Sequence, residues 1–467
     1  MCSRWNTIIR SRPSHFLDQL HFGNEDSTLF LKNISHRRGS SITHSLERSS
    51  LSTLNLNYDL ISPSAQTSKC DEDEIVVLLQ YLERVCFLRL HLSLSTWRSI
   101  AAATSVMPVS CTCIEYICLD TGNRTTGFVL PDLFLKGHAP RLHTLIMIGV
   151  FPPSLSSLLL SPTHLTRLIL DGIPDASYLP PRELLMHLGN MPKLQCLSIG
   201  FLSATRHRHL TGDVNPISSP NHVVLPCLKK FHFRGVCTYL ESLVTNLDAA
   251  AVRELVFNFF YQLRYTILHV SAFLRRTKRF GFDGIRIKFW PDGIVIIATP
   301  AISPTPEDVL CFRILCNRLD FQVASAVQIC RALGPNFGNM EDLFVSYSQD
   351  QLPTPWHTEV HPALWRELFS QFRGMKTLWI SSALISEVTN AMGYDTLQLF
   401  EDLPILAWVV VEIHGDGDDP STTAAHSLSE LLARVRSFGG PVVDVYRLFS
   451  DKWKMGRLPE EARVSGD

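Results

Sequence analysis

One apolar spacing recurs along most of this chain and limits how it can fold. It is clearest at Met191 to Gly200, where Leu194, Leu197 and Ile199 stand at positions i, i+3 and i+5 and a glycine follows. The last two positions are two residues apart, so on a β-strand they point to the same side. We expect the first position to fill the turn that leads into the strand.

Copies of this spacing follow one another along the chain. Their middle residues are Leu54, Leu88, Ile117, Leu145, Leu168, Leu197, Phe231, Leu255, Phe280, Leu343, Leu378 and Val409. The first copy uses Leu51, Leu54 and Leu56, and a degenerate copy uses Thr277, Phe280 and Phe282. Successive middle residues lie 23 to 35 positions apart, except for one step of 63 from 280 to 343.

Leucine-rich repeats have a comparable period of about 20–29 residues. A single unit of this length cannot bury its own apolar strand face, so neighbouring units must stack on one another. The spacing therefore predicts an α/β fold, an irregular leucine-rich-repeat-like solenoid (horseshoe) with strands on one face and helices on the other. The alternative is that a leucine-rich chain matches the spacing by chance.

Flanking residues predict individual elements. Asp71 and Glu74 have capping-box spacing, which predicts a helix with Asp71 as its N-cap. Pro181 suits the first turn of a helix at 181–190. Two alternating apolar runs flank Pro291, Asp292 and Gly293, which predicts a β-hairpin inserted at the long step. Further expected elements are a strand at 309–316, helices at 323–332 and 428–438, and a last strand at 442–448.

These patterns divide the chain into six parts. The expected division is 1–22, the remnant of a helix described below; 23–70, a loop-rich lead-in with the first repeat strand; 71–283, leucine-rich-repeat-like units; 284–336, the inserted hairpin, strand and helix; 337–450, C-terminal repeat-like units; and 451–467, a flexible tail, with the segment 205–220 an exposed loop.

Charge and cysteine usage limit the partners. Lys and Arg number 43 against 44 Asp and Glu, which argues against a nucleic-acid or anionic-membrane partner attracted by bulk charge. The 12 cysteines are scattered and the first ten residues contain no apolar signal core, so we expect reduced thiols in a cytoplasmic or nuclear protein. No apolar run approaches 18 residues, so no transmembrane helix is expected.

Familiar catalytic motifs are absent from the sequence. It contains no phosphate-binding glycine loop, dinucleotide fingerprint, zinc-protease helix or nucleophile elbow. Cys111, Cys113 and Cys118 are the nearest approach to a metal cluster, but no second cysteine pair completes a four-ligand site. We therefore expect buried thiols there, and no catalytic residue, cofactor or metal.

Four further groups each have a structural and a functional interpretation. The structural one is favoured in every case, and the alternative stays open. The interpretations are a solvated loop or a phosphate or RNA contact for Arg206, His207, Arg208 and His209; a helix C-terminus or a nuclear-localisation patch for Arg275, Arg276, Lys278 and Arg279; an acidic loop or a calcium site for His414, Asp416, Asp418 and Asp419; and core packing or a binding hot spot for Trp356, His357, Trp365 and Trp379.

Several segments resemble a known family. Cys2 to Pro13 reads C-S-R-W-x-x-I-I-x-S-x-P, which resembles the closing segment of an F-box, although the leading L-P-x-E-[IL] element has no counterpart before Met1. The rest resembles the F-box-associated proteins of mushroom-forming fungi (basidiomycetes). The matching segments are Ala139 to Met147, Met191 to Ile199, Leu225 to Phe233, Cys316 to Val323, Trp365 to Phe372 and Arg436 to Val442.

This resemblance implies a protein-interaction scaffold with a truncated F-box. Such a protein is the substrate-recognition subunit of an SCF-type ubiquitin ligase, with a protein client on the repeat face and the ligase adaptor at the F-box end. The adaptor-facing residues would be Cys2, Arg4, Trp5, Ile8 and Ile9. Two alternatives remain: a solenoid that binds a protein partner with no ubiquitin role, and, more remotely, an enzyme with its site near 284–310 or 350–362.

Overall fold

The computed structural model is an α/β structure with a large, mostly parallel sheet. It describes residues 54–59, 69–104, 112–122, 127–131, 139–152, 158–160, 162–203, 222–277, 282–299, 309–337, 340–347, 360–392, 406, 408–414 and 442–448. The chain divides into two compact units. We call the part from β1 to α8 the N-terminal unit and the part from β13 to β19 the C-terminal unit, and describe each by itself.

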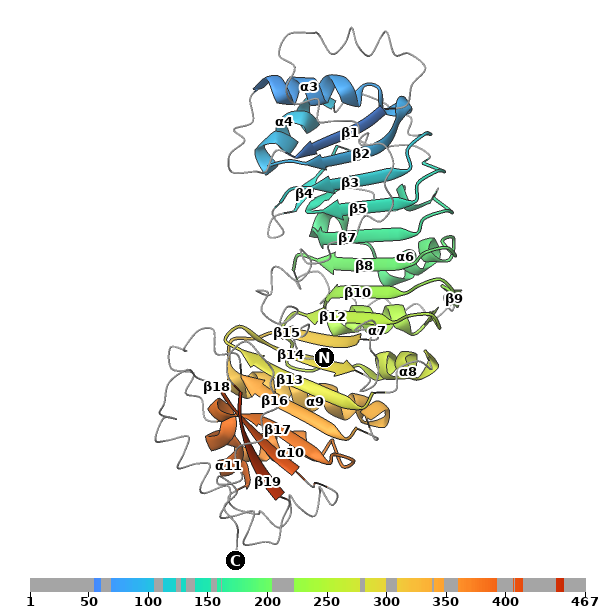
Figure 1. The fold of residues 1–467 in the computed structure, drawn as a ribbon. Helices are drawn as coiled ribbons and strands as arrows, with labels where there is room; N and C mark the ends of the chain where they lie inside the picture. The colour runs from blue at the N-terminus through green and yellow to red at the C-terminus, as the bar shows by residue number, and fades with distance from the viewer. Residues whose placement is uncertain are drawn as a thin grey trace, which may run out of the picture. The chain divides into compact units, whose positions relative to one another are not determined.

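The main strands of the N-terminal unit pair in chain order, and every pair is parallel (Figure 1). Their bounds are β1 (Leu54–Asp59), β2 (Val85–His91), β3 (Tyr116–Asp120), β5 (Thr144–Ile148), β7 (Arg167–Ile173), β8 (Cys196–Phe201), β10 (Lys230–Gly235) and β12 (Glu254–Phe259). Two short parallel pairs add β4 (Phe128–Val129) with β6 (Val150–Phe151), and β9 (Val223–Val224) with β11 (Leu247–Asp248).

Helices cover the apolar side of this sheet. The described ones are α3 (Lys69–Leu79), α4 (Leu94–Thr104), α6 (Pro181–Leu188), α7 (Cys237–Val244) and α8 (Leu268–Arg276), with 3-10 turns η1 (Leu82–Arg84) and η2 (Asp175–Ser177). Neighbouring helices α6, α7 and α8 lie along one side of the strands in Figure 1. The Tyr239 hydroxyl on α7 donates to the carbonyl oxygen of Leu179 at 2.7 Å, which ties the helix layer to the loop before α6.

The recurring apolar spacing forms the core of the N-terminal unit. The middle residues lie in register from strand to strand, and each is 0% exposed: Leu88, Ile117, Leu145, Leu168, Leu197, Phe231 and Leu255. The first residues of these copies are also 0% exposed, including Leu142, Leu194 and Val252. Full burial of one such side chain contributes about 1.5–3 kcal/mol. The prediction that this position fills the turn before the strand is therefore confirmed.

The C-terminal unit combines parallel and antiparallel pairing. Its strand order is β15-β14-β13-β16-β17-β18-β19, in which β14 pairs antiparallel with both β13 and β15, and all other pairs are parallel. The strands are β13 (Gly284–Trp290), β14 (Gly293–Thr299), β15 (Val309–Leu315), β16 (Asp342–Tyr347), β17 (Thr377–Ser381), β18 (Trp408–His414) and β19 (Val442–Leu448). The helices are α9 (Leu319–Phe337), α10 (Pro362–Phe369) and α11 (Ile385–Met392), with the 3-10 turn η4 (Ser382–Leu384).

The expected hairpin around Asp292 is confirmed, but its place in the fold differs from the prediction. Its first strand, β13, pairs parallel with β16, with Ile285 beside Leu343 and Ile287 beside Val345. Strand β13 therefore carries the recurring spacing, and the extra elements are β14, β15 and α9. The strand expected at 309–316 and the helix expected at 323–332 are confirmed as β15 and α9.

Two copies of the spacing were placed in the wrong register. The degenerate copy does not begin at Thr277, because Thr277 closes α8 and donates its hydroxyl to the Leu274 carbonyl oxygen at 2.6 Å; Phe280 lies outside the described residues. Phe282 instead takes the turn position, ahead of Ile285 and Ile287 in the strand.

In the first copy, Leu56 lies beside Leu88, whereas Leu54 lies beside Val85, with an irregularity after Leu54. That irregularity moves the aligned residues two positions later than the sequence predicts.

Some of the predicted helix and strand boundaries agree with the structure and others do not. Helix α3 begins at Lys69, so Asp71 lies inside the helix and is not its N-cap. Helix ends assigned from sequence commonly differ by one or two residues. Helix α6 has Pro181 in its first turn, and β19 has the expected bounds. The predictions for 1–22, 205–220, 428–438 and 451–467 concern positions outside the described residues.

Candidate functional site

The side of the N-terminal sheet opposite the apolar core is the candidate site, and we call it the strand face. On β2 to β12, alternate residues lie on this face in three rows that run across the strands. The first row is Phe87, Tyr116, Thr144, Arg167, Cys196, Lys230 and Glu254; the second is Arg89, Cys118, Ile146, Ile169, Ser198, His232 and Val256; the third is His91, Asp120, Ile148, Asp171, Gly200, Arg234 and Asn258.

The middle of the strand face is apolar. Ile146 and Ile169 lie side by side and are 8% and 9% exposed, and Ile148 is half-buried beside them. Phe87 and Tyr116 add a stacked aromatic pair with ring centroids 4.3 Å apart. Burial raises the pKa of Tyr116 to about 12, so its hydroxyl stays protonated at neutral pH. This area is therefore apolar, and the hydroxyl-bearing residues Tyr116 and Thr144 lie side by side in the row next to it.

Glu254 binds two basic groups at one end of the strand face. Lys230 Nζ lies 2.7 Å from Glu254 Oε2, and His232 Nε2 lies 2.8 Å from Glu254 Oε1. Burial alone would raise the pKa of Glu254, but the hydrogen bonds and charges of His232 and Lys230 outweigh it and lower the pKa to about 2. Glu254 is therefore ionised at neutral pH and holds both basic side chains in place.

A glycine allows a second ion pair on the strand face. Arg234 on β10 lies 3.4 Å from Asp171 on β7, measured from Nη2 to Oδ1, although β8 runs between the two strands. Gly200 is the β8 residue between them, and a Cβ atom there would lie 2.2 Å from Asp171 Oδ1. Arg234 Nε also donates to the Phe201 carbonyl oxygen at 3.2 Å. The missing side chain at Gly200 thus provides the space in which the two charges meet.

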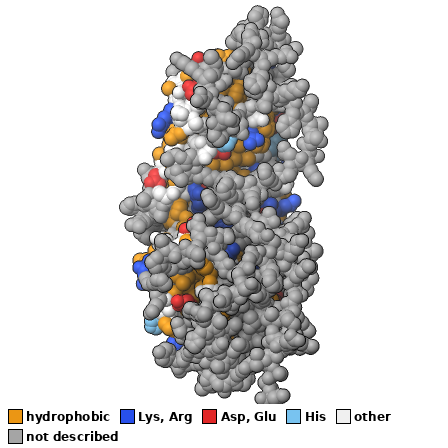
Figure 2. Space-filling model, turned by 60° about the vertical axis from the view of Figure 1, so that its left-hand side comes forward, with side chains coloured by type: hydrophobic (Ala, Val, Ile, Leu, Met, Phe, Trp, Pro, Cys, Tyr) orange, Lys and Arg blue, Asp and Glu red, His pale blue; other side chains and the backbone are white. Residues whose placement is uncertain are grey.

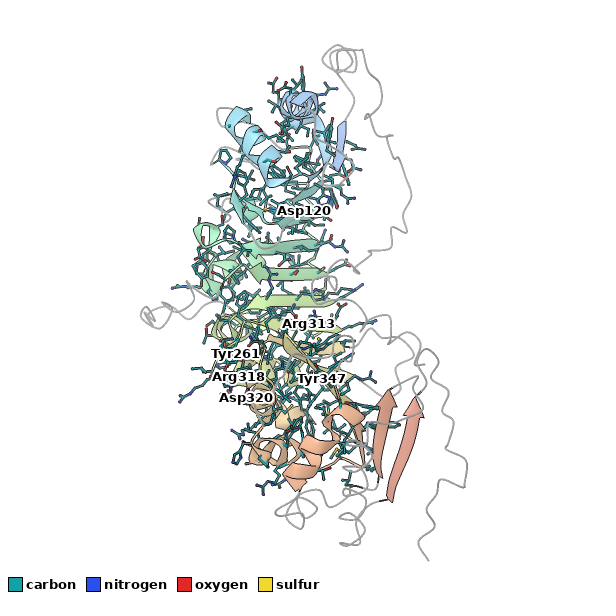
Figure 3. All side chains as sticks on the ribbon, turned by 90° about the vertical axis from the view of Figure 1, so that its left-hand side faces the viewer. Asp120, Tyr261, Arg313, Arg318, Asp320 and Tyr347 are labelled. Atoms are coloured by element: carbon teal, nitrogen blue, oxygen red, sulfur yellow. The ribbon has the colours of Figure 1, made fainter. Side chains whose placement is uncertain are left out.

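Asp120 lies beside His91 at the other end of the third row, where β3 ends (Figure 3). Its carboxylate lies 3.5 Å from His91 Nε2 and accepts a 2.7 Å hydrogen bond from the Gly122 backbone N–H. Gly122 has a φ of 65°, a left-handed conformation that glycine adopts without strain. The Asp120 carbonyl oxygen also accepts from Trp97 Nε1 at 3.1 Å. Asp120 is therefore fixed by contacts from a strand, a turn and a helix.

Ser198, His232 and Glu254 are the nearest approach to catalytic chemistry on this face. Ser198 lies beside His232 in register, and His232 binds Glu254. Serine nucleophiles act through a hydrogen bond to the histidine and a nearby set of oxyanion donors. Among the described hydrogen bonds, His232 has its bond to Glu254 but none to Ser198. The arrangement therefore holds the charged groups of His232 and Glu254 together.

The described side chains that are visible in Figure 2 are of mixed type. In the space-filling view, hydrophobic side chains are interspersed with Lys and Arg, and the coloured residues form no continuous field of one sign (Figure 2). This distribution accompanies the near balance of 43 basic and 44 acidic residues. Local pairs such as Lys230 with Glu254, and not net charge, therefore set the electrostatics of the strand face.

The expected cysteine cluster is described only in part. Cys113 and Cys118 carry free thiols, and Cys111 lies outside the described residues. Burial raises the pKa of the Cys118 thiol to about 11, so it is a poor nucleophile at neutral pH. Within the described parts of the chain, no group of three or more His, Cys, Asp or Glu side chains is placed to hold a metal ion.

The remaining predicted groups lie partly within the described residues. Arg275 and Arg276 end α8 as the structural interpretation expects, and Arg276 donates to the carbonyl oxygens of Val244 and Leu247 at 3.0 and 3.2 Å. Trp365 is 0% exposed in the core, whereas Trp379 is half-buried and stacks on Phe344.

The other predicted residues are outside the described part of the chain: Cys2, Arg4, Trp5, Ile8, Ile9, Arg206, His207, Arg208, His209, Lys278, Arg279, Trp356, His357, Asp416, Asp418 and Asp419. His414 ends β18, and its side chain is likewise not described.

Sequence reasoning missed the polar residues of the strand face. Asp171, Arg234, His232 and Glu254 each stand one residue before or after an apolar repeat position, so alternation alone places them on the opposite face. That signal marks the face but does not say which side chains meet, since each contact joins strands more than 20 residues apart in the chain.

Comparison with known proteins adds no family assignment. The chain matches no protein-family model, and no curated protein is significantly similar to it. None of the described helices has the length and apolar character needed to cross a bilayer.

Proposed function

We propose that the chain is an irregular leucine-rich-repeat-like solenoid that serves as a protein-interaction scaffold, with a protein client on the strand face. Two observations support the solenoid. The main strands of the N-terminal unit pair in chain order and in parallel, and the recurring apolar residues lie in register across them. Such an arrangement places one side of every strand away from the helix layer along the whole sheet.

The composition of the strand face is the main observation in support of a client-binding site there. Its apolar middle contains Ile146, Ile148 and Ile169, and charged side chains such as Arg234 and Glu254 lie around it. Protein interfaces typically combine an apolar centre with a polar rim. The rim charges are already held in pairs, so the face is preorganised, which reduces the entropy lost on binding.

A role in ubiquitin ligation is the second part of the proposal. It is supported by the resemblance of Cys2 to Pro13 to the end of an F-box, in which Trp5 would face the ligase adaptor. Under this proposal the protein acts in the cytoplasm or nucleus as the substrate-recognition subunit of an SCF-type ligase, and it is not itself an enzyme. The alternative is a scaffold that binds its client with no ligase attached.

Site-specific photo-crosslinking in cells tests the client site. A benzoylphenylalanine introduced at Ile148 places the crosslinker on the strand face, and the same residue at Met186 places it on α6, where the native side chain is 59% exposed. We expect one defined protein to be crosslinked from position 148 and not from position 186. Equal labelling from both positions, or none from 148, would contradict the proposal.

Mass spectrometry of the purified complexes distinguishes a ligase subunit from a scaffold with no ligase attached. Recovery of a cullin and its adaptor with the full chain, and their loss when residues 1–22 are deleted, would support the ligase role. Recovery of the same crosslinked client without any ligase subunit would support the adaptor-free scaffold.

A further inference from the structure

We propose that the N-terminal unit has a second binding surface, at the edge of the sheet where its strands begin, and that its ligand is an acidic segment of a partner protein. We call this surface the turn edge. It is defined by five exposed basic residues in the turns that enter β5, β7, β8 and β10: Arg141, His143, His164, Lys193 and Lys229. The strand face is the outward side of the same strands, so the turn edge is a different surface and does not depend on the client site.

Parallel pairing brings the turns before successive strands to the same edge of the sheet (Figure 1). Backbone hydrogen bonds connect these turns in order. Lys229 donates its N–H to the Gln195 carbonyl oxygen at 2.8 Å, and Gln195 donates to Thr166 at 2.7 Å. Thr166 in turn donates to His143 at 2.8 Å. Basic side chains from four separate parts of the sequence therefore lie along one edge.

Two of the basic residues are presented by the same kind of β-turn. In 139–142 and in 191–194, the N–H of the fourth residue donates to the carbonyl oxygen of the first at 3.1 Å. The second residue is proline, whose ring fixes its φ angle, and the fourth is a leucine that is 0% exposed. The third residue is Arg141 in one turn and Lys193 in the other. The backbone beneath both side chains is thus fixed before a ligand binds, which reduces the entropy lost on binding.

The turn edge gathers basic groups and lacks carboxylates. Lys193 Nζ lies 3.1 Å from His164 Nδ1, and the ring centres of His164 and His143 are 6.4 Å apart. A neutral imidazole nitrogen accepts a hydrogen bond from an ammonium group without neutralising its charge. Among the described residues, no carboxylate forms an ion pair with Arg141, Lys193 or Lys229. This edge therefore carries a local excess of positive charge, which attracts an anionic ligand.

The sequence of the turns explains this excess. The segments 139–144, 162–167, 191–196 and 225–230 together contain five Lys or Arg residues and two His, and no Asp or Glu. Glu115, in the turn before β3, is the first acidic residue beyond His143 along this edge. It limits the turn edge on that side.

The size and side-chain types of the turn edge favour a protein segment as the ligand. The four turns span three strand spacings of about 4.8 Å, or about 14 Å, which an extended peptide covers with about four residues. Arginine also pairs with a carboxylate through two parallel N–H bonds. The same four segments contain no Phe, Tyr or Trp, so the bases of a single-stranded nucleic acid would have no such ring on which to stack.

Binding of fluorescein-labelled decaglutamate to the full-length protein tests this proposal by fluorescence anisotropy. We expect saturable binding that weakens as salt is raised from about 50 to 300 mM, because salt screens the attraction between exposed charges. The variant R141Q/K193Q/K229Q should bind about tenfold more weakly, because it lacks three of the cations. The exchange variant R141K/K193R/K229R keeps these charges and should stay within about threefold of the native affinity.

The control variant R98Q/R331Q/R373Q makes the same change in net charge at exposed residues that do not belong to the turn edge. Arg98 lies on α4, Arg331 lies on α9 and Arg373 precedes β17. This variant should bind decaglutamate within about twofold of the native affinity. Equal loss in the two glutamine variants, or no salt-sensitive binding, would overturn the proposal. Tighter binding of a ten-nucleotide oligothymidine that is lost in R141Q/K193Q/K229Q would overturn it in favour of a nucleic-acid surface.

Cys227 reports where the peptide binds. It is exposed and is the third residue of the turn 225–228, as Arg141 and Lys193 are of theirs. Iodoacetyl-decaglutamate should alkylate Cys227 about tenfold faster than iodoacetyl-decaserine at low salt, because the positive edge concentrates the acidic peptide there. Peptide mapping by mass spectrometry measures both rates, and equal rates would overturn the proposal. Failure of the crosslink at position 148 would leave these results unchanged, since that position lies on the strand face.

Discussion

Asp171 and Arg234 lie on strands that are not neighbours, yet their charges meet 3.4 Å apart across Gly200. The pair depends on an absent side chain, because a Cβ at position 200 would lie 2.2 Å from Asp171 Oδ1. Asp171 is 3% exposed, so its carboxylate has little access to water if the pair is broken. This relationship joins three strands of the strand face and makes the glycine a requirement of its charge pattern.

Gly200→Ala should therefore destabilise the protein by about 1–3 kcal/mol, because the new methyl group displaces a buried charged partner. Urea denaturation followed by tryptophan fluorescence measures this change. Gly284→Ala is the matched control, since a Cβ there would meet its nearest neighbour at an ordinary 3.7 Å, and it should cost less than about 1 kcal/mol. Equal losses in the two variants would show that the space at Gly200 is not special.

Glu254→Gln tests the three-residue network at the end of the strand face. The pKa of Glu254 is lowered to about 2 in the folded protein, against 4.5 for an ordinary glutamate. The contribution of the ionised Glu254 carboxylate to the free energy of unfolding is therefore present above about pH 4.5 and is lost as the pH falls toward about 2. We expect Glu254→Gln to cost about 2 kcal/mol at pH 7, with allowance for partial exposure.

Stability measurements of the native protein and of Glu254→Gln between pH 7 and pH 3 check this prediction. The two curves should converge as the pH falls, because protonation removes the same charge that the substitution removes. A constant difference across this range would contradict the ionised network.

His187 should make the protein sensitive to mild acid. It is 1% exposed on α6, and neither ring nitrogen has a hydrogen-bond partner among the described residues. Burial lowers its pKa from 6.5, and the nearby charge of Glu183 opposes this only in part. Below about pH 6.5 the unfolded chain therefore binds a proton that the folded protein does not, and stability falls with pH.

A His187→Leu variant removes this group and keeps the site apolar. Between pH 7.5 and 5.5 we expect the native protein to lose up to about 1 kcal/mol more stability than the variant. Thermal unfolding at several pH values measures the difference. Parallel profiles for the two proteins would mean that His187 is protonated equally in the folded and unfolded states.

Glu241 on α7 caps the neighbouring helix α8. Its two carboxylate oxygens accept hydrogen bonds from the His269 and Val270 backbone N–H groups, both at 2.8 Å. Glu241→Ala should cost about 1–3 kcal/mol, because it removes the acceptors of two N–H groups in the first turn of α8. Glu241→Gln keeps one acceptor oxygen and should cost less.

The control for this prediction is Glu115→Ala, which removes an exposed carboxylate and should change stability by less than about 0.5 kcal/mol. Urea denaturation compares the three variants. If Glu241→Ala costs no more than the control, the cap does not contribute to stability.

The repeat strands could be predicted because their signal is local. Leu168 and Leu170 are buried for the same reason that Leu197 and Ile199 are: each pair is two residues apart on a strand. The shift at the degenerate copy shows the limit of this signal. Phe282 fits the spacing both as the last residue after Phe280 and as the first residue before Ile285, and the parallel pairing of Ile285 with Leu343 decides between them.

The side-chain contacts on the outward faces of the two units could not be predicted in the same way. Alternation places Arg234 and Asp171 on one face, but their pairing depends on the register of two strands and on the space at Gly200. On the C-terminal unit, it is likewise the fold of β14 and β15 that brings Arg313 into the row of Lys288.

The sequence by itself indicated which residues of most repeat strands face the helix layer, because apolar alternation is set by neighbouring positions in the covalent chain. Only the tertiary structure decided which outward residues touch. Those contacts join strands that are 20 or more residues apart, as with His232 and Glu254, and a shift of two residues in one strand would pair different side chains.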